Sequence, residues 1–265
     1  MERVLLKPPT SWQAYDFYMR ASAIYSLFHS SFRVNNLYEA RRLLEHSISI
    51  DPTYSRAYAL LSSTFITAYL QPLDNDYLDR SVLDRALAIG RKALQLDSNL
   101  PQAHGNLGHV LTFMCEHDAA IVEHERALEL NPNYSDWRFG TALVRGGEAA
   151  RAIAILERHK RLDPFYVPMT LLWFGLAYYM VKQYSQALQT LRDCVSRAPE
   201  MRHGHAWLAA TYSQLGQINE ARAATAEALR IDPSYKINVV PPFPFKNPED
   251  VEHYFEGLRK AGVPE

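Results

Sequence analysis

The stretch Asp51-Pro52-Thr53-Tyr54 stops a predicted helix and returns along the chain at nearly constant spacing. Its other copies are Asp97–Leu100, Asn131–Tyr134, Asp163–Tyr166, Ala198–Met201 and Asp232–Tyr235, of which Asp97–Leu100 and Ala198–Met201 are weaker. The last residues of the six stretches lie 46, 34, 32, 35 and 34 positions apart. A fixed period in this range indicates one supersecondary unit that is stacked repeatedly, because no single unit can bury its own apolar face.

The third unit, Pro101 to Tyr134, shows what is repeated. Two runs carry apolar side chains at the three-to-four spacing of a helix face, and a short polar turn at Glu116–Asp118 separates them. Pro132 then blocks continuation, because it lacks an N–H and disfavours helical geometry in the residue before it. The unit is therefore predicted to be a helix, a turn, a second helix and a stop.

Small residues recur at matching places in successive units. They are Gly108, Gly140, Gly175 and Ala209 in the first helices, and Ala120, Ala152, Ala187 and Ala221 in the second helices. Two helices can approach to about 8–10 Å only where the contacting side chains are small. Gly147 and Gly216 fall at the intervening turns, where left-handed backbone is commonly needed. The pattern therefore predicts closely packed helix pairs.

This pattern resembles the tetratricopeptide-repeat family, whose signature places large, small and aromatic residues and a proline at set offsets. The matching residues are His104, Leu107, Gly108, Leu111, Ala120, His124, Ala127 and Pro132 in the third unit, and Leu171, Phe174, Gly175, Tyr178, Ala187, Leu191, Cys194 and Pro199 two units later. The resemblance implies an all-α fold, namely a right-handed α-solenoid of about six helix-turn-helix repeats with a C-terminal capping helix.

The period also predicts where the repeats begin and end. We expect the solenoid to occupy residues 1–235, with repeats at about 12–54, 55–100, 101–134, 135–166, 167–201 and 202–235. The second repeat contains an insertion at Gln71–Asp76, which is either a tolerated loop or a contribution to binding.

Residues 236–265 break the period and are expected to form an extended apolar strip followed by a helix. Asn247 suits the N-cap, Pro248 suits the first helical position and Gly262 suits the stop. The apolar stripe of this helix is formed by Val251, Tyr254, Phe255 and Leu258. We expect the helix to cap the exposed face of the last repeat, and the alternative is that it docks another domain.

Charge and cysteine usage limit the partners and the compartment. The net charge of −1 predicts no general attraction to nucleic acid or to an anionic membrane. Cys115 and Cys194 belong to different repeats, so they predict no disulfide framework and fit a reducing compartment. The amino-terminal apolar run is too short for a signal peptide, and no longer run predicts a membrane span. We therefore expect a soluble, cytoplasmic protein.

No stretch has the spacing of a phosphate loop, a dinucleotide fingerprint, a nucleophile elbow or a zinc protease helix. The densest set of candidate metal ligands is His104, His109, Cys115, His117, Asp118 and His124. The repeat register directs these side chains to different sides of their helices, whereas a metal needs three or four that converge. We therefore expect a non-enzymatic protein with no cofactor and no metal.

The first helices of such a repeat array are expected to line a concave inner surface. The register places Asn106, His109, Phe113, Trp137, Arg138, Arg145, Trp173, Tyr179 and Trp207 on it. Trp and Arg are the residues most often found as binding anchors. The surface therefore predicts a groove for a peptide or a helical segment of a protein partner that carries apolar and acidic side chains. The alternative is that some of these aromatic residues pack between repeats or beneath the C-terminal tail.

A second resemblance is wider but less specific. The opening stretches Lys7–Thr10 and Ala14–Arg20, with the closing stretches Asn247–Asp250 and Gly257–Gly262, are similar to the C-terminal repeat region of bacterial class III adenylate cyclases and related signalling proteins. The resemblance implies an alternative function, a regulatory or oligomerisation arm of a bacterial cyclase or transcription regulator. The chain is then either the repeats alone or, from Met1, a fragment of a larger protein. Oligomeric state, partner and pathway stay open at this point.

Overall fold

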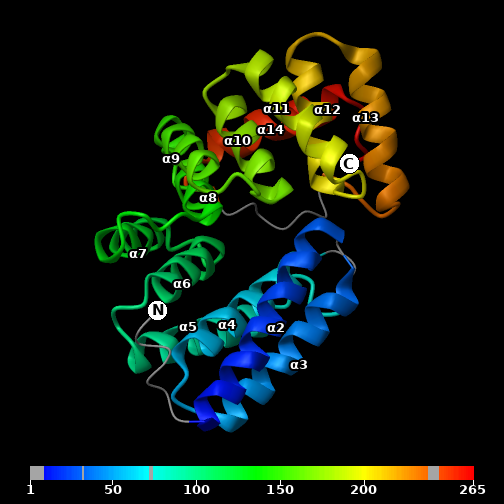
Figure 1. Ribbon diagram of the computed structural model, residues 1–265. Helices are drawn as coiled ribbons and strands as arrows, with labels where there is room; N and C mark the ends of the chain where they lie inside the picture. Colours follow the sequence, from blue (N-terminus) through cyan, green and yellow to red (C-terminus); the bar gives the residue numbers. More distant parts are fainter. Residues whose placement is uncertain (1–8, 32, 72–73, 238–244) are drawn as a thin grey trace. The chain divides into compact units, whose positions relative to one another are not determined.

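The computed structural model describes residues 9–31, 33–71, 74–237 and 245–265, which contain thirteen helices and no strand (Figure 1). The helices are α2 (Pro9–Ser31), α3 (Val34–Ile50), α4 (Ser55–Leu70), α5 (Arg80–Leu96), α6 (Pro101–Phe113), α7 (His117–Leu130), α8 (Trp137–Arg145), α9 (Ala149–Leu162), α10 (Pro168–Met180), α11 (Tyr184–Arg197), α12 (Arg202–Gln214), α13 (Ile218–Ile231) and α14 (Pro248–Lys260). The prediction of an all-α helical-repeat fold is confirmed for this part of the chain. The apolar strip predicted before α14 lies largely at 238–244, outside the described residues.

The chain divides into two compact units, and the division passes through α7. One unit comprises residues 1–113 and 122–134, and the other comprises residues 114–121 and 135–265. In the first unit, α2 packs against α3 and α4 against α5. In the second unit, α8 packs against α9, α10 against α11 and α12 against α13. The proposed repeat limits stay a prediction, but each of these contacts joins consecutive helices.

The recurrent Asp or Asn explains why the second helices stop where they do. Asp51 places its backbone N–H 3.0 Å from the carbonyl oxygen of Ser47, and its side-chain Oδ1 accepts a hydrogen bond from the backbone of Thr53 at 3.0 Å. The same side-chain turn recurs from Asp97 to Asn99, Asn131 to Asn133, Asp163 to Phe165 and Asp232 to Ser234. An Asp or Asn that bonds its own backbone two residues on favours a turn over further helix.

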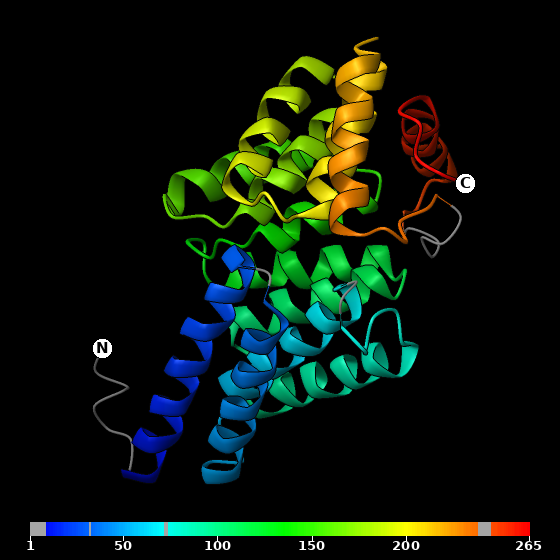
Figure 2. The ribbon, with the colours of Figure 1, turned by 90° about the vertical axis from the view of Figure 1, so that its right-hand side faces the viewer.

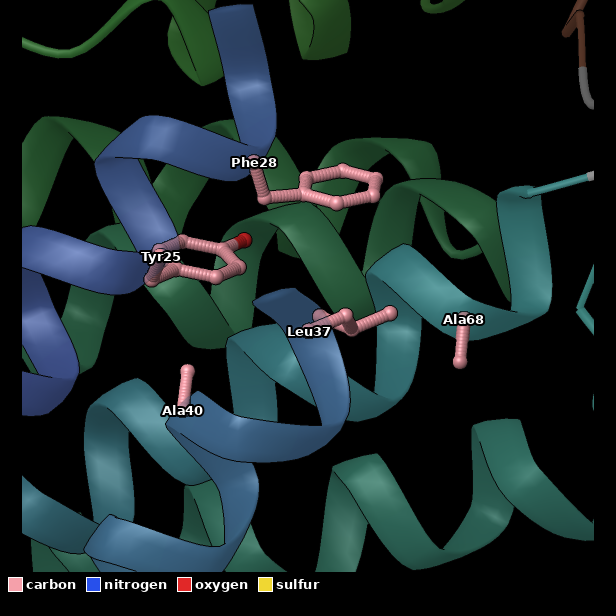
Figure 3. Close-up of a cluster of buried hydrophobic side chains, with 5 residues drawn as sticks. All are labelled: Tyr25, Phe28, Leu37, Ala40 and Ala68. Carbon is pink, nitrogen blue, oxygen red and sulfur yellow. The ribbon is translucent and has the colours of Figure 1, made fainter. Parts of the chain in front are cut away.

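A small core joins the first three helices of the first unit. Figure 3 shows Tyr25 and Phe28 of α2, Leu37 and Ala40 of α3, and Ala68 of α4, all of which are buried. The hydroxyl of Tyr25 lies 2.7 Å from the hydroxyl of Thr67, so the one polar atom of this cluster has a partner. The cluster therefore buries aromatic surface without an unsatisfied polar group, and it ties α2 to the two following helices.

Glycines allow the close helix contacts of the second unit. A Cβ placed on Gly140 would lie 2.6 Å from Leu156, and one on Gly175 would lie 2.5 Å from Leu191. Both leucines are fully buried, so neither can move aside easily. The expectation that small residues at these positions serve close approach is confirmed for these two helix pairs.

Left-handed backbone occurs at corresponding turns between paired helices. Gly147 and Gly216 have φ values of 84° and 74°, as their place in the sequence predicts. Cys115 and Lys182 adopt similar values, 65° and 61°, without being glycine. The turn geometry is therefore retained where the residue type does not favour it.

The last helix, α14, lies within the second unit and packs chiefly against α12. Figures 1 and 2 show it in red, on one side of α10 and α12. No helix in the described ranges combines the length and the apolar character needed to cross a bilayer.

Candidate functional site

Three of the predicted groove residues, Asn106, His109 and Phe113, lie on α6 in the first unit and are buried there. The Asn106 side-chain amide donates a hydrogen bond of 2.9 Å to the carbonyl oxygen of Ala59 on α4. The ring of His109 meets that of Phe113 edge-on, with centroids 5.2 Å apart. The Asn106 bond links α6 to α4, whereas the contact between His109 and Phe113 lies within α6. The role of these three residues in partner binding stays a prediction.

The other six lie on the first helices of successive pairs in the second unit. Trp137, Arg138 and Arg145 belong to α8, Trp173 and Tyr179 to α10, and Trp207 to α12. All are buried except Arg138, whose side chain is 13 % exposed and pairs with Asp136 at 3.2 Å. The C-terminal tail, residues 245–265, covers part of this set of six residues. We call Arg145, Trp173, Tyr179, Trp207 and Ala210 the docking face.

Aromatic stacking fixes the centre of α14 on the docking face. The ring of Tyr254 stacks on Trp207, with centroids 3.6 Å apart and an interplanar angle of 17°. Tyr179 meets Trp207 edge-on at 5.4 Å and 77°. Such aromatic pairs contribute about 0.5–1.5 kcal/mol beyond the burial of their area. Burial raises the pKa of the Tyr254 hydroxyl well above its usual range, and its oxygen lies 3.4 Å from that of Tyr235.

Polar contacts and a glycine bring α14 still closer to α10 and α12. The hydroxyl of Tyr179 donates to the backbone carbonyl of His253 at 3.0 Å and accepts from the side-chain amide of Gln214 at 3.2 Å. A Cβ on Gly257 would lie 2.7 Å from the Tyr179 oxygen and 2.9 Å from the Cβ of Ala210. Position 257 therefore has no room for a side chain while α14 is docked.

The segment that leads into α14 is held at the end of α8. The backbone N–H of Lys246 donates to the carbonyl oxygen of Arg145 at 2.7 Å, and its ammonium lies 2.6 Å from the carboxylate of Asp118. The guanidinium of Arg145 lies 4.9 Å from the Trp173 ring centroid and 5.1 Å from that of Phe245. The bond to Lys246 lowers the pKa of Asp118. This pair is exposed, so the backbone bond and the ring contacts provide most of the anchoring.

The end of α14 reaches the last helix pair. The hydroxyl of Thr225 on α13 donates to the carbonyl oxygen of Ala261 at 3.2 Å, and the N–H of Ile237 donates to that of Pro264 at 2.9 Å. Leu258 is fully buried. The tail thus contacts α8 through Phe245 and Lys246, α10 and α12 through α14, and α13 through Ala261, so it does not cover the last repeat alone.

This placement covers part of the surface on which the groove was predicted. Tyr179 and Trp207 pack beneath the tail, which is the alternative that the sequence left open. The physical reason is the stripe of Tyr254, Gly257 and Leu258, whose exposure to water would be unfavourable and for which the aromatic first helices offer a partner surface. The missed signal is Gly257, because a glycine inside an amphipathic helix marks a close backbone approach.

The predicted metal-ligand candidates do not converge in the part of the chain that the structure describes, where no three His, Cys, Asp or Glu side chains form a metal-binding group. His104 instead lies 2.6 Å from the carboxylate of Glu123 and 3.0 Å from the carbonyl oxygen of Ser98. These contacts explain its position as a link between α6 and α7.

His253 is the titratable residue at the centre of the docked helix. Its ring lies against that of Tyr179, with centroids 4.7 Å apart, and its Nε2 is 3.2 Å from the hydroxyl of Tyr184. Burial, followed by the positive charge of Lys182, lowers its pKa below the ordinary histidine value of 6.5. The other charged groups that face it are Glu256 and Asp250, which raise the pKa, and Lys260, which lowers it further.

Acidification is expected to weaken the docking of α14. Because the docked state holds His253 at a lowered pKa, the unfolded state binds more protons and stability rises with pH. The stabilisation is complete above 6.5 and declines as the pH falls from 6.5 towards the lowered pKa of docked His253. Urea midpoints measured at about pH 7.5 and pH 5 should differ less for His253→Gln than for the wild-type chain. An identical pH dependence in both proteins would contradict this assignment.

Comparison with known proteins agrees with the repeat architecture. Family models described as tetratricopeptide repeat match residues 101–134 and 179–237. Among solved structures, the Cut9–Hcn1 hetero-tetramer of the APC/C has a TM-score of 0.62 at 17% identity. The alignment covers 94% of this chain and 46% of the matched chain. A tetratricopeptide repeat protein from Parabacteroides merdae ATCC 43184 has a TM-score of 0.52 at 14% identity, and the alignment covers 95% of this chain and 93% of the matched chain. These likenesses concern the fold.

A curated relative, "Putative adenylate cyclase 3" of Rhizobium meliloti (strain 1021), is 30% identical over 108 residues. The match covers 41% of this chain and spans only 17% of the length of that relative. The relation is therefore distant and partial.

The fold and the repeated helix pairs define an all-α solenoid of the protein-interaction class. The chain carries tetratricopeptide repeats at residues 101–134 and 179–237, and its other helix pairs have the same architecture. Proteins with these repeats are generally non-enzymatic scaffolds that bind protein or peptide partners.

Proposed function

We propose that this chain is a scaffold that binds a peptide or helical segment of a protein partner along the first helices of residues 135–265. The observation that supports this most is α14 itself, because the docking face already holds an amphipathic helix through the stack of Tyr254 on Trp207. A surface that seats one such helix has the shape and the aromatic anchors for another. No catalytic group takes part in this proposal.

The chemistry of the proposed partner follows from the same helices. Aromatic side chains of Trp137, Trp173 and Trp207 provide apolar contacts, and Arg138 and Arg145 provide positive charge. Guanidinium groups favour carboxylates because they can donate two parallel hydrogen bonds. We therefore expect the bound segment to combine apolar side chains with Asp or Glu.

Replacing Arg138 with alanine is expected to weaken partner binding about tenfold, which is a typical loss for an interfacial arginine. Arg138 is the partly exposed member of the predicted set, so its removal tests the surface without opening the core. The partner would be isolated by affinity capture with the full chain and identified by mass spectrometry. Its affinity would then be measured by calorimetry.

The matched control is Arg192→Ala, which removes an exposed arginine from α11, the second helix of a pair. The proposal expects unchanged affinity for this variant. Equal losses in both variants, or no loss in Arg138→Ala, would argue against binding at the first helices.

The partial match to a cyclase supports a second candidate, a regulatory or oligomerisation arm of a larger signalling protein. In this case the chain would associate with itself at working concentrations. Light scattering tests this directly, because the monomer mass is 30.3 kDa. A mass near twice that value supports the arm, and a monomer at high micromolar concentration contradicts its oligomerisation role.

A further inference from the structure

The helix pairs of the second unit are complete without α14. Trp207 and Ala210 belong to α12, which packs against α13, and Tyr179 belongs to α10, which packs against α11. Helix α14 adds a layer on the first helices and is not part of any pair. We propose that α14 is a displaceable occupant of the docking face, and that a partner helix replaces it. This inference rests on the proposed function and adds the identity of the segment that binds.

The contacts of α14 define what a replacing helix must carry. An aromatic ring is needed where Tyr254 stacks on Trp207 at 3.6 Å. Glycine is needed three positions later, because any Cβ there meets Tyr179 and Ala210 at under 3.0 Å. A leucine follows directly, where Leu258 is fully buried. The partner is therefore an amphipathic helix with the pattern aromatic-x-x-Gly-Leu.

The polar contacts of α14 can be made by another helix. Tyr179 and Thr225 donate to the backbone carbonyls of His253 and Ala261, and every peptide offers such carbonyls. The ion pairs of α14 with itself, such as Lys260 with Glu256, lie on its exposed side and do not fix it to the docking face. Recognition thus depends chiefly on the aromatic, glycine and leucine positions, and the contacts to backbone carbonyls are independent of sequence. His253 adds a ring contact with Tyr179 and a 3.2 Å contact with the Tyr184 hydroxyl.

A single substitution, at Gly257, is expected to release α14 from the docking face. In Gly257→Leu the new side chain has no space against Tyr179 and Ala210, so α14 should leave while the docking face keeps its own residues. The matched control is Glu256→Leu, which adds the same side chain one position earlier, on the exposed side of the helix. Hydrogen exchange of the α14 amides reports release.

Binding in trans is measured with a fluorescein-labelled synthetic peptide of residues 245–265 and the full-length proteins. We expect Gly257→Leu to lose protection in α14 alone and to bind the peptide at least tenfold tighter than either the wild-type chain or Glu256→Leu. A peptide that itself carries Gly257→Leu should not bind. Anisotropy gives each affinity.

Several results would overturn the inference. If α14 stays protected in Gly257→Leu, the close approach does not control docking. If α14 is released and the peptide still does not bind, the docking face does not accept this pattern and the inference is wrong. The proposed function would still stand if a captured partner lost affinity for Arg138→Ala. Equal peptide affinity for wild type and Gly257→Leu would place the peptide elsewhere. Peptide-induced dissociation of a wild-type dimer would assign the face to a second copy of the chain.

A second variant covers the case in which Gly257→Leu disrupts more than the tail. Tyr254→Ser removes the stack on Trp207 and adds no bulk. It should release α14 and allow the peptide to bind in the same way. Loss of protection throughout α8 to α13 in both variants would show that α14 is a permanent part of the unit, and the inference would then be wrong.

Discussion

Replacing Trp207 with alanine is expected to lower the free energy of unfolding of the second unit by about 3–5 kcal/mol. Trp207 is only 2 % exposed and contacts two aromatic rings, those of Tyr254 and Tyr179. Its removal leaves a cavity beneath α14 and removes the stack, so transfer, packing and aromatic contributions are lost together. Urea unfolding followed by far-ultraviolet circular dichroism measures the change.

The control for Trp207→Ala is another aromatic truncation. Phe165 is 92 % exposed at a turn, so Phe165→Ala should change the free energy of unfolding by no more than about 0.5 kcal/mol. A loss below about 1 kcal/mol for Trp207→Ala would show that the indole is not buried as described.

Replacing Gly175 with alanine is expected to destabilise the protein by about 1–3 kcal/mol. Helix propensity alone would predict the opposite sign, a gain of up to about 1 kcal/mol, because alanine is the better helix former. The added Cβ would lie 2.5 Å from Leu191, which is fully buried between α10 and α11. The clash should therefore outweigh propensity, and thermal or urea unfolding decides the sign.

A double-mutant cycle isolates the cause. In Leu191→Ala the side chain that meets the new methyl group is absent, so Gly175→Ala should cost little or become favourable in that background. Gly90→Ala is a milder comparison, since its Cβ would meet the Ser62 oxygen at 3.2 Å. Stabilisation by Gly175→Ala in the wild-type background would contradict the close approach of the two helices.

The helix pairs could be predicted from the sequence because each signal is local. Asp51 and its counterparts bond to the backbone two residues ahead, and Gly147 adopts the left-handed turn that its position requires. The left-handed turn at Lys182 carries no such signal, because there the surrounding helix pair determines the backbone conformation. Local chemistry therefore predicts most of the fold and misses positions that tertiary packing controls.

The docking face could be predicted only in part. The register correctly placed Tyr179 and Trp207 on first helices of successive pairs. An apolar stripe on α14 shows that the helix is buried but does not show against what, since any aromatic surface within reach offers similar free energy. The specific partner is determined by the fit of Gly257 against Ala210, which requires both helices to be placed in space.

The proposals together describe a scaffold whose binding surface is covered by its own tail. Where a surface is covered for part of the time, the apparent affinity of a partner is its intrinsic affinity multiplied by the fraction of time that the surface is free. Acidification, through His253, and substitution at Gly257 both shift this equilibrium towards the free surface. Partner binding should therefore become tighter under mildly acidic conditions in the wild-type chain, and less so in His253→Gln.

Every proposal about the docking face requires that α14 lies on the first helices of the second unit with Tyr254 stacked on Trp207. Nuclear Overhauser effects between the Tyr254 ring and the Trp207 indole, in selectively labelled wild-type protein, test it most directly. Ring centroids 3.6 Å apart predict strong effects between these side chains. Their absence, with random-coil chemical shifts for residues 248–260, would show that α14 does not dock on Trp207.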